Sequence, residues 1–87
     1  MIALVYGERF LQSVRVLPAP QQKKLARLLE ALRENPYYPL LHTKRLSGEL
    51  AGILAFRITR DWRVMFQFND PTTVQLLRVV HRRDAYR

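Results

Sequence analysis

The chain has 87 residues, of which 48% are hydrophobic and 25% are charged, and it contains no cysteine. This length fits a single domain, residues 1–87, and the composition is that of a folded globular protein. The absence of cysteine excludes disulfide bridges and thiolate metal sites, and it fits a reducing cytoplasm. The formal net charge of +8 is the strongest bulk signal, because such a cation attracts polyanions such as RNA, DNA or an acidic protein segment.

No segment is predicted to cross or anchor to a membrane. The longest stretch without a charged residue is 35–43, which contains two prolines and is too short to span a bilayer. The N-terminus is apolar for only a few residues and lacks a basic leader, so we do not expect a signal peptide. We therefore expect a cytoplasmic location.

The first half of the chain predicts a strand followed by two helices. Residues 1–6 read as a short strand that Gly7 ends, and apolar residues then recur at helical spacing from Glu8 until Pro18. Pro20 begins a second helix, which ends at Asn35-Pro36. The short Pro-Ala-Pro link between them favours an antiparallel helical hairpin. One apolar face of the second helix comprises Leu25, Leu28, Leu29 and Leu32.

Residues 35–50 form a long connection with two prolines and a glycine. Long ordered connections in compact domains are often functional. This one carries Lys44 and Arg45, which taken alone would be ordinary solvated charges.

After Gly52 the apolar period changes to two, which is typical of strands. One face of the first two strands is predicted to hold Leu54, Phe56, Ile58, Trp62, Val64, Phe66 and Phe68. The opposite face carries Arg57 and Arg63. The last strand, 73–80, has apolar residues on both faces, so its orientation does not follow from the pattern.

These elements predict an α+β fold in the order β-α-α-β-β-β. The N-terminal strand and the helical hairpin accompany an antiparallel sheet, and the hairpin covers the apolar face of that sheet. We expect a buried core of Leu25, Leu28, Leu29, Leu32, Phe56, Val64 and Phe66. The other face is expected to be open.

The C-terminal sequence HRRDAYR follows the last strand directly. It is therefore placed to bring Arg82 or Arg83, together with Tyr86, beside Arg57 and Arg63. Several arginines on one face repel each other unless an anion lies among them, and a phosphate matches the guanidinium geometry. Asp84, isolated among these arginines, is expected to pair with one of them.

Three motifs in residues 44–87 resemble the RelE/ParE toxin superfamily of toxin–antitoxin systems. They are K-R-L-S-G at 44–48, W-R-V-M-F at 62–66 and L-R-V-V-H-R-R-D-A-Y at 77–86. The retained terminal arginine and tyrosine make the chain more similar to the RelE-like branch than to the ParE-like branch. It departs from the best-known RelE pattern in having Ala55 and Arg57 where two lysines are usual, and Trp62 where tyrosine is usual.

The resemblance implies a metal-independent mRNA endoribonuclease without a cofactor, which cuts mRNA in the ribosomal A site. In this scheme the 2′-hydroxyl of the RNA attacks the adjacent phosphate. The implied catalytic residues are Arg63, Arg82, Arg83 and Tyr86. The implied RNA-binding residues are Lys44, Arg45, Arg57 and Arg60. A cognate antitoxin would hold the protein inactive and provide most of its oligomerisation.

Two other interpretations stay open from the sequence. The first is a ParE-like inhibitor that binds DNA gyrase and cuts nothing, and the second is an inactive member that retains only antitoxin binding. Clustering of the arginines and Tyr86 in one groove would favour the ribonuclease, whereas a dispersed set would favour the two alternatives.

Overall fold

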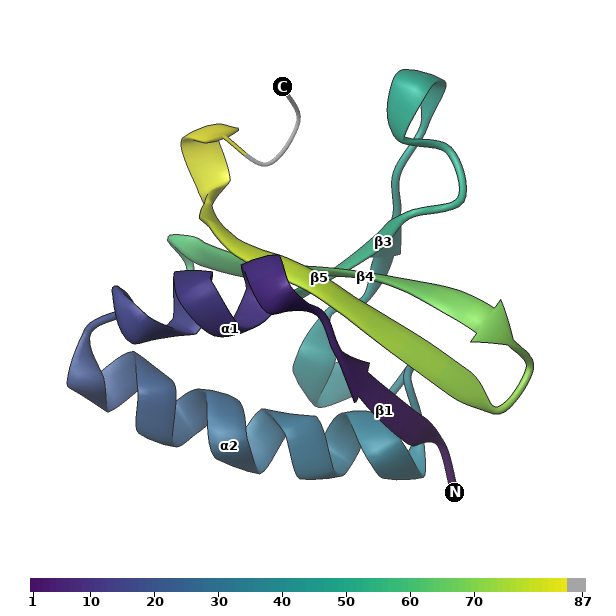
Figure 1. The fold of residues 1–87 in the computed structure, drawn as a ribbon, viewed down its shortest axis with the longest axis horizontal. Helices are drawn as coiled ribbons and strands as arrows, with labels where there is room; N and C mark the ends of the chain where they lie inside the picture. Colours follow the sequence, from purple (N-terminus) through teal and green to yellow (C-terminus); the bar gives the residue numbers. More distant parts are fainter. Residues whose placement is uncertain (85–87) are drawn as a thin grey trace.

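The computed structural model describes residues 1–84, which form two helices on one face of a five-stranded sheet (Figure 1). The predicted α+β class with its helical hairpin is confirmed. The elements in chain order are β1 (Ala3–Tyr6), α1 (Glu8–Arg15), α2 (Ala19–Glu34), β2 (Lys44–Arg45), β3 (Leu54–Arg57), β4 (Trp62–Asp70) and β5 (Thr73–His81). Three 3-10 turns accompany them: η1 (Pro39–Leu41), η2 (Gly48–Leu50) and η3 (Arg82–Asp84).

Both helices bury their apolar faces against the sheet. Phe10 of α1 and Leu25, Leu28 and Leu32 of α2 are buried. Leu29 was expected in the same core but is only partly buried. It lies one residue, or roughly 100°, around α2 from Leu28, so its side chain lies at the flank of the buried stripe. No helix within residues 1–84 has both the length and the apolar character needed to cross a membrane.

Strands β3, β4 and β5 form the predicted antiparallel meander. Phe56, Val64 and Phe66 have no exposed surface, whereas Arg57 of the same sheet is exposed. The alternation in the sequence therefore assigned the two faces of β3 and β4 correctly. The rings of Phe56 and Phe66 lie 6.0 Å apart between their centroids, at the centre of the core.

Two further strands extend the sheet beyond this meander, in the order β1-β5-β4-β3-β2. β1 pairs with β5 in parallel, from Ala3 opposite Thr73 to Tyr6 opposite Leu76. The sheet is therefore mixed, and β1 forms one of its edges. β2 forms the other edge, where Lys44 pairs with Ala55 and Arg45 pairs with Leu54.

The face of the sheet away from the helices is only partly open, contrary to expectation. Leu46, Ala55 and Met65 are buried there, and Leu50, Ile53, Leu77 and Val80 pack around them. The connection that contains η2 provides Leu46, Leu50 and Ile53, so the loop covers part of this face. The sheet thus has a large core on its helical side and a small apolar cluster on the other.

Gly7 sits where β1 leaves the sheet and enters α1, and we predict that Gly7→Ala destabilises the fold. A Cβ atom at this position would lie 2.6 Å from the carbonyl oxygen of Leu76. The Gly7 N–H also donates to that oxygen at 3.0 Å, so the backbone contact anchors β1 to β5. Crowding of this kind costs about 1–3 kcal/mol of unfolding free energy. Thermal melts would measure it, and Gln12→Ala on the exposed side of α1 is the control, expected to change stability by no more than about 0.5 kcal/mol.

Candidate nucleic-acid interface

The strand register gathers four basic residues on the face of the sheet away from the helices. Arg57, Arg63 and Val80 are aligned across β3, β4 and β5. In the next row, Lys44, Ala55, Met65 and Arg78 are aligned across all four strands from β2 to β5. We refer to Lys44, Arg57, Arg63 and Arg78 as the basic face.

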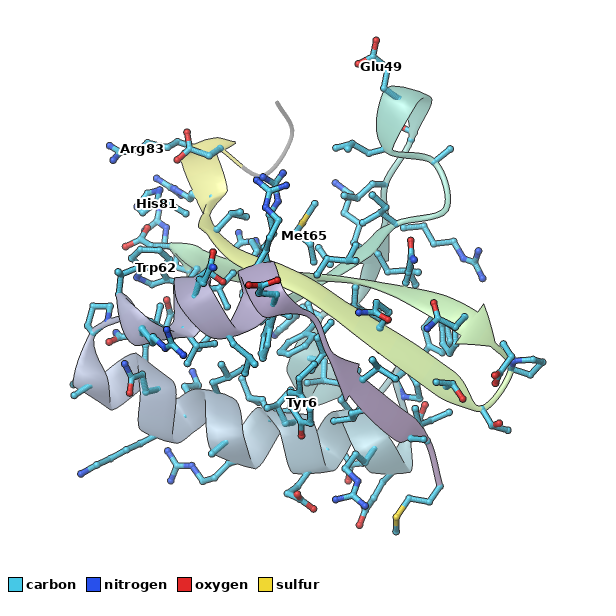
Figure 2. All side chains as sticks on the ribbon, in the orientation of Figure 1. Tyr6, Glu49, Trp62, Met65, His81 and Arg83 are labelled. Atoms are coloured by element: carbon cyan, nitrogen blue, oxygen red, sulfur yellow. The ribbon has the colours of Figure 1, made fainter. Side chains whose placement is uncertain are left out.

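The basic face borders the small apolar cluster and lies between two projections of the chain. The η2 connection and the η3 turn rise from the sheet on the side opposite the helices (Figure 1). In Figure 2, Met65 points to this side, between the turn that carries Arg83 and the loop that carries Glu49. Met65 itself is buried, so the basic side chains lie beside an apolar surface.

Arg57 and Arg63 are directly opposite each other on β3 and β4. Like charges in this arrangement destabilise a sheet. Within residues 1–84, neither of them nor Arg78 forms an ion pair with a carboxylate. This arrangement is suited to an anionic ligand, because a phosphate between the guanidinium groups would relieve their repulsion.

Arg63 also has a structural role in the turn between β3 and β4. Its Nη1 group donates to the carbonyl oxygens of Thr59 at 2.9 Å, Arg60 at 2.8 Å and Trp62 at 3.4 Å. These bonds all use one nitrogen, so within the described part of the chain Nε and Nη2 keep their N–H groups for another acceptor. The guanidinium is thus held in place while two of its donor positions stay available.

The same turn holds the start of the C-terminal segment. The Arg82 N–H donates to the carbonyl oxygen of Asp61 at 2.7 Å, and the Arg82 Nε lies 3.6 Å from a carboxylate oxygen of Asp61. The rings of Trp62 and His81 meet edge to face at 5.3 Å between centroids. One turn therefore positions both Arg63 and η3.

The second arginine of η3 is tethered less firmly. The Arg83 N–H donates to His81 Nδ1 at 3.3 Å, and its side chain is 75% exposed. Its Nε lies 3.9 Å from a carboxylate oxygen of Asp84, which confirms the expectation that Asp84 pairs with an arginine. Tyr86, the remaining residue predicted to be catalytic, lies outside the described residues.

The predicted RNA-binding residues divide between the two faces of the sheet. Lys44 and Arg57 belong to the basic face. Arg45 is in register with Leu54 and so lies on the helical side, where its Nη2 donates to the Tyr37 hydroxyl at 3.3 Å. Consecutive residues of a strand point to opposite faces, which separates Arg45 from Lys44. Arg60 is exposed in the β3–β4 turn.

Arg78 is the member of the basic face that the sequence did not reveal. It pairs with Met65 on β4, whereas Phe66 pairs with Leu76, so Leu77 forms an irregularity in the register. This extra residue shifts the alternation of β5 by one position. This shift explains why residues 73–80 show apolar residues on both faces in the sequence. The sequence pattern alone does not show at which residue the shift occurs.

The comparisons with known proteins agree with this architecture. The family model described as "ParE toxin of type II toxin-antitoxin system, parDE" matches residues 6–86. No curated protein matches the sequence.

Several solved structures share the fold over nearly the whole chain. YafQ from E. coli strain BL21(DE3) is 15% identical with a TM-score of 0.80, and the match covers 100% of both chains. The toxin–antitoxin complex RelBE2 from Mycobacterium tuberculosis contains a chain that is 28% identical with a TM-score of 0.69, covering 93% of this chain and 98% of that one. The archaeal RelE–RelB complex from Pyrococcus horikoshii OT3 contains a chain 17% identical with a TM-score of 0.77, covering 97% and 98%. The family match and these folds show that the chain belongs to the RelE/ParE superfamily of toxins of type II toxin–antitoxin systems.

Proposed function

We propose that this toxin is an endoribonuclease that cuts mRNA in the ribosomal A site without a catalytic metal. The observation that carries the proposal is the pair of opposed arginines, Arg57 and Arg63, with Arg78 in the adjoining row. Fixed cations of this kind stabilise a phosphate as it gains charge in a transition state. The η3 turn is bonded to the same β3–β4 turn that Arg63 contacts. The surface also suits the RelE-like mechanism that the C-terminal motif implies.

In the proposed reaction the RNA supplies its own nucleophile. The 2′-oxygen forms a bond to the adjacent phosphorus as its proton passes to a base, and the bond from phosphorus to the 5′-oxygen breaks as that oxygen takes up a proton. The products are a 2′,3′-cyclic phosphate and a 5′-hydroxyl. Orienting an internal nucleophile in this way removes much of the entropic barrier.

The contacts of each arginine favour different roles. The Nε and Nη2 groups of Arg63, which have no hydrogen-bond partner among residues 1–84, suit contact with the phosphate. Arg82 is paired with Asp61, so we assign it to positioning the C-terminal segment, and Arg83 to binding the phosphate or assisting the leaving oxygen. Tyr86 would orient or deprotonate the 2′-hydroxyl, or stack on a base. Arginines placed near its hydroxyl would favour the phenolate form that proton abstraction requires.

The chemistry of the cut ends tests the proposal. Purified toxin, ribosomes and a labelled mRNA should give fragments with a 2′,3′-cyclic phosphate and a 5′-hydroxyl. The same mRNA with a single 2′-deoxynucleotide at the cleaved position should remain whole. Cleavage of the deoxy substrate would contradict an attack by the 2′-hydroxyl.

Inhibition of DNA gyrase is the second candidate function, because the family model that matches the chain is named after the ParE toxin. A supercoiling assay with purified gyrase distinguishes the two. Loss of supercoiling together with intact mRNA would favour the ParE-like interpretation. If both substrates are unaffected while the antitoxin still binds, the chain is an inactive member of the superfamily.

For the antitoxin we propose a docking site on the helical side. Tyr6, Phe10, Leu11 and Val14 face Gln22, Leu25, Ala26 and Leu29 across an open apolar groove of about 230 Å³. The groove begins beside β1, which is an edge strand. An amphipathic helix fits such a groove, and an extended segment fits an open strand edge. Acidic residues in the same partner would complement the net charge of +8, and the segment that silences the toxin would cover the basic face or displace the C-terminal segment.

We predict that Leu11→Glu weakens antitoxin binding at least tenfold and leaves mRNA cleavage unchanged. Leu11 is 46% exposed at the groove, so a charge there enters the apolar contact rather than the core. An unpaired carboxylate buried in an apolar contact costs several kcal/mol, and a tenfold loss of affinity needs only about 1.4 kcal/mol. Titration calorimetry with the product of the adjacent gene would measure it. Gln12→Glu introduces the same charge one residue away, outside the groove, and should bind normally; equal loss in both variants would contradict this docking site.

A further inference from the structure

The connection between α2 and β2 displays an aromatic patch, which we define as Tyr37, Tyr38, Leu40 and Arg45. Tyr37 is 49% exposed, Tyr38 is 45% exposed and Leu40 is 58% exposed. Exposed aromatic and apolar side chains that gather in one patch are candidates for an interaction site. Neither the proposed cleavage site nor the antitoxin groove includes them.

The loop that carries the patch is firmly anchored. Pro36 and Leu41 are buried, and the Thr43 hydroxyl donates to the carbonyl oxygen of Pro36. The Tyr37 N–H donates to the Asn35 side chain at 2.9 Å, and the Leu41 N–H donates to the Tyr38 carbonyl at 2.9 Å. The exposed side chains are therefore presented by a fixed backbone, which lowers the entropic cost of binding.

Tyr37 contacts both an aromatic ring and a cation. Its ring lies near that of Phe68, with centroids 6.4 Å apart and planes inclined by 22°. Its hydroxyl accepts a hydrogen bond from Arg45 Nη2 at 3.3 Å. A half-exposed aromatic ring beside a guanidinium group is the combination on which unpaired nucleobases stack while a neighbouring phosphate is neutralised.

The charge around the patch favours a polyanion over a basic or neutral partner. Between Glu34 and Glu49 the charged side chains of this connection are Lys44 and Arg45, and Arg45 hydrogen-bonds to Tyr37 of the patch. Lys44 and Arg45 are consecutive on the edge strand β2, so the former lies on the basic face and the latter on the patch. The edge therefore connects the two surfaces with positive charge.

We propose that the aromatic patch is a second binding surface for single-stranded RNA, with bases stacked on Tyr37 and Tyr38 and a phosphate on Arg45. The inference rests on the proposed ribonuclease function and extends its substrate contact around the β2 edge. The occupant we assign is the mRNA that flanks the cleaved bond, because β2 joins the patch to the basic face.

The test compares a Tyr37→Leu/Tyr38→Leu double variant with a Tyr37→Phe/Tyr38→Phe variant. Leucine keeps apolar bulk but removes the rings, whereas phenylalanine keeps both rings. The expected loss of RNA affinity is about 5- to 150-fold for each base that no longer stacks, and only for the leucine variant. Arg45→Gln probes the same patch without altering a ring and should also weaken binding.

Two binding assays identify the source of the RNA. The first measures fluorescence anisotropy with a 2′-O-methyl oligonucleotide that cannot be cut. The second measures co-sedimentation with ribosomes that carry no mRNA. Weaker oligonucleotide binding supports contact with mRNA, whereas weaker ribosome binding alone would overturn the assignment to mRNA and indicate ribosomal RNA. Unchanged affinity in both assays would overturn the proposal, and so would a loss confined to antitoxin binding.

Cleavage by the unaltered toxin separates this proposal from the proposed function. If the unaltered toxin cuts mRNA and the leucine variant has the same KM and the same affinities, the patch does not bind RNA although the ribonuclease function holds. If the unaltered toxin cuts nothing, the function fails, and the oligonucleotide assay still decides whether the patch binds RNA.

Discussion

Replacement of Arg63 by glutamine should lower the rate of mRNA cleavage about a hundredfold or more, because it removes a preorganised cation from the proposed transition state. The effect on stability should be smaller but measurable. A surface substitution commonly changes the free energy of unfolding by no more than about 0.5 kcal/mol. Arg63, however, holds three carbonyl groups of the β3–β4 turn, so we expect a cost of about 1–2 kcal/mol.

The experiment must separate the lost charge from the loosened turn. Ribosome-dependent cleavage and thermal melts on the same preparations measure both, and about 1 kcal/mol corresponds to roughly 4–8 °C in Tm at this size. Arg63→Lys keeps the positive charge but loses the paired N–H donors of the guanidinium group. An intermediate cleavage rate would therefore indicate that Arg63 contacts the phosphate through two hydrogen bonds. Arg15→Gln makes the same charge change at an exposed site on α1 and should cut normally. A wild-type rate for Arg63→Gln would contradict the proposed role of Arg63.

The largest effect on stability is expected from Phe56→Ala. Phe56 has no exposed surface, and its ring contacts that of Phe66 at the centre of the main core. Truncating a buried phenylalanine costs about 3–5 kcal/mol, whereas a domain of this length has only about 4–13 kcal/mol in total. A substantial fraction of the variant should therefore be unfolded at 37 °C.

Denaturant titration followed by circular dichroism would measure this loss. Phe56→Leu fills most of the cavity and should lose less than half as much. The neighbouring substitution Arg57→Ala alters the other face and should leave stability within about 0.5 kcal/mol of the wild type. If Phe56→Ala were as stable as Arg57→Ala, the assignment of Phe56 to the core would be wrong.

The parts of the fold that the sequence predicted are those with a clean apolar period. The leucines of α2 recur with a helical period, and Phe56, Val64 and Phe66 alternate with Arg57 and Arg63. Each pattern puts its apolar residues on one face, and both faces are buried when α2 packs against the sheet. The opposed arginines of the candidate site followed from the same alternation.

The remainder depends on pairing between segments that are distant in sequence. The parallel contact of β1 with β5 leaves no local signal, because it joins residues 3–6 to residues 73–76. The irregularity at Leu77 moved Arg78 onto the basic face. β2 is only two residues long, so its short sequence did not show that Lys44 and Arg45 would lie on opposite sides of the sheet.

The two sides of the sheet have a consequence for how the toxin is neutralised. The apolar groove belongs to the helical layer, whereas Arg57 and Arg63 lie beyond the sheet from it. If the antitoxin binds in the groove, one stretch of it provides the affinity for the toxin. A different stretch must then reach the arginines and inhibit the toxin. An antitoxin shortened to its groove-binding stretch should then bind and stabilise the toxin without inhibiting it.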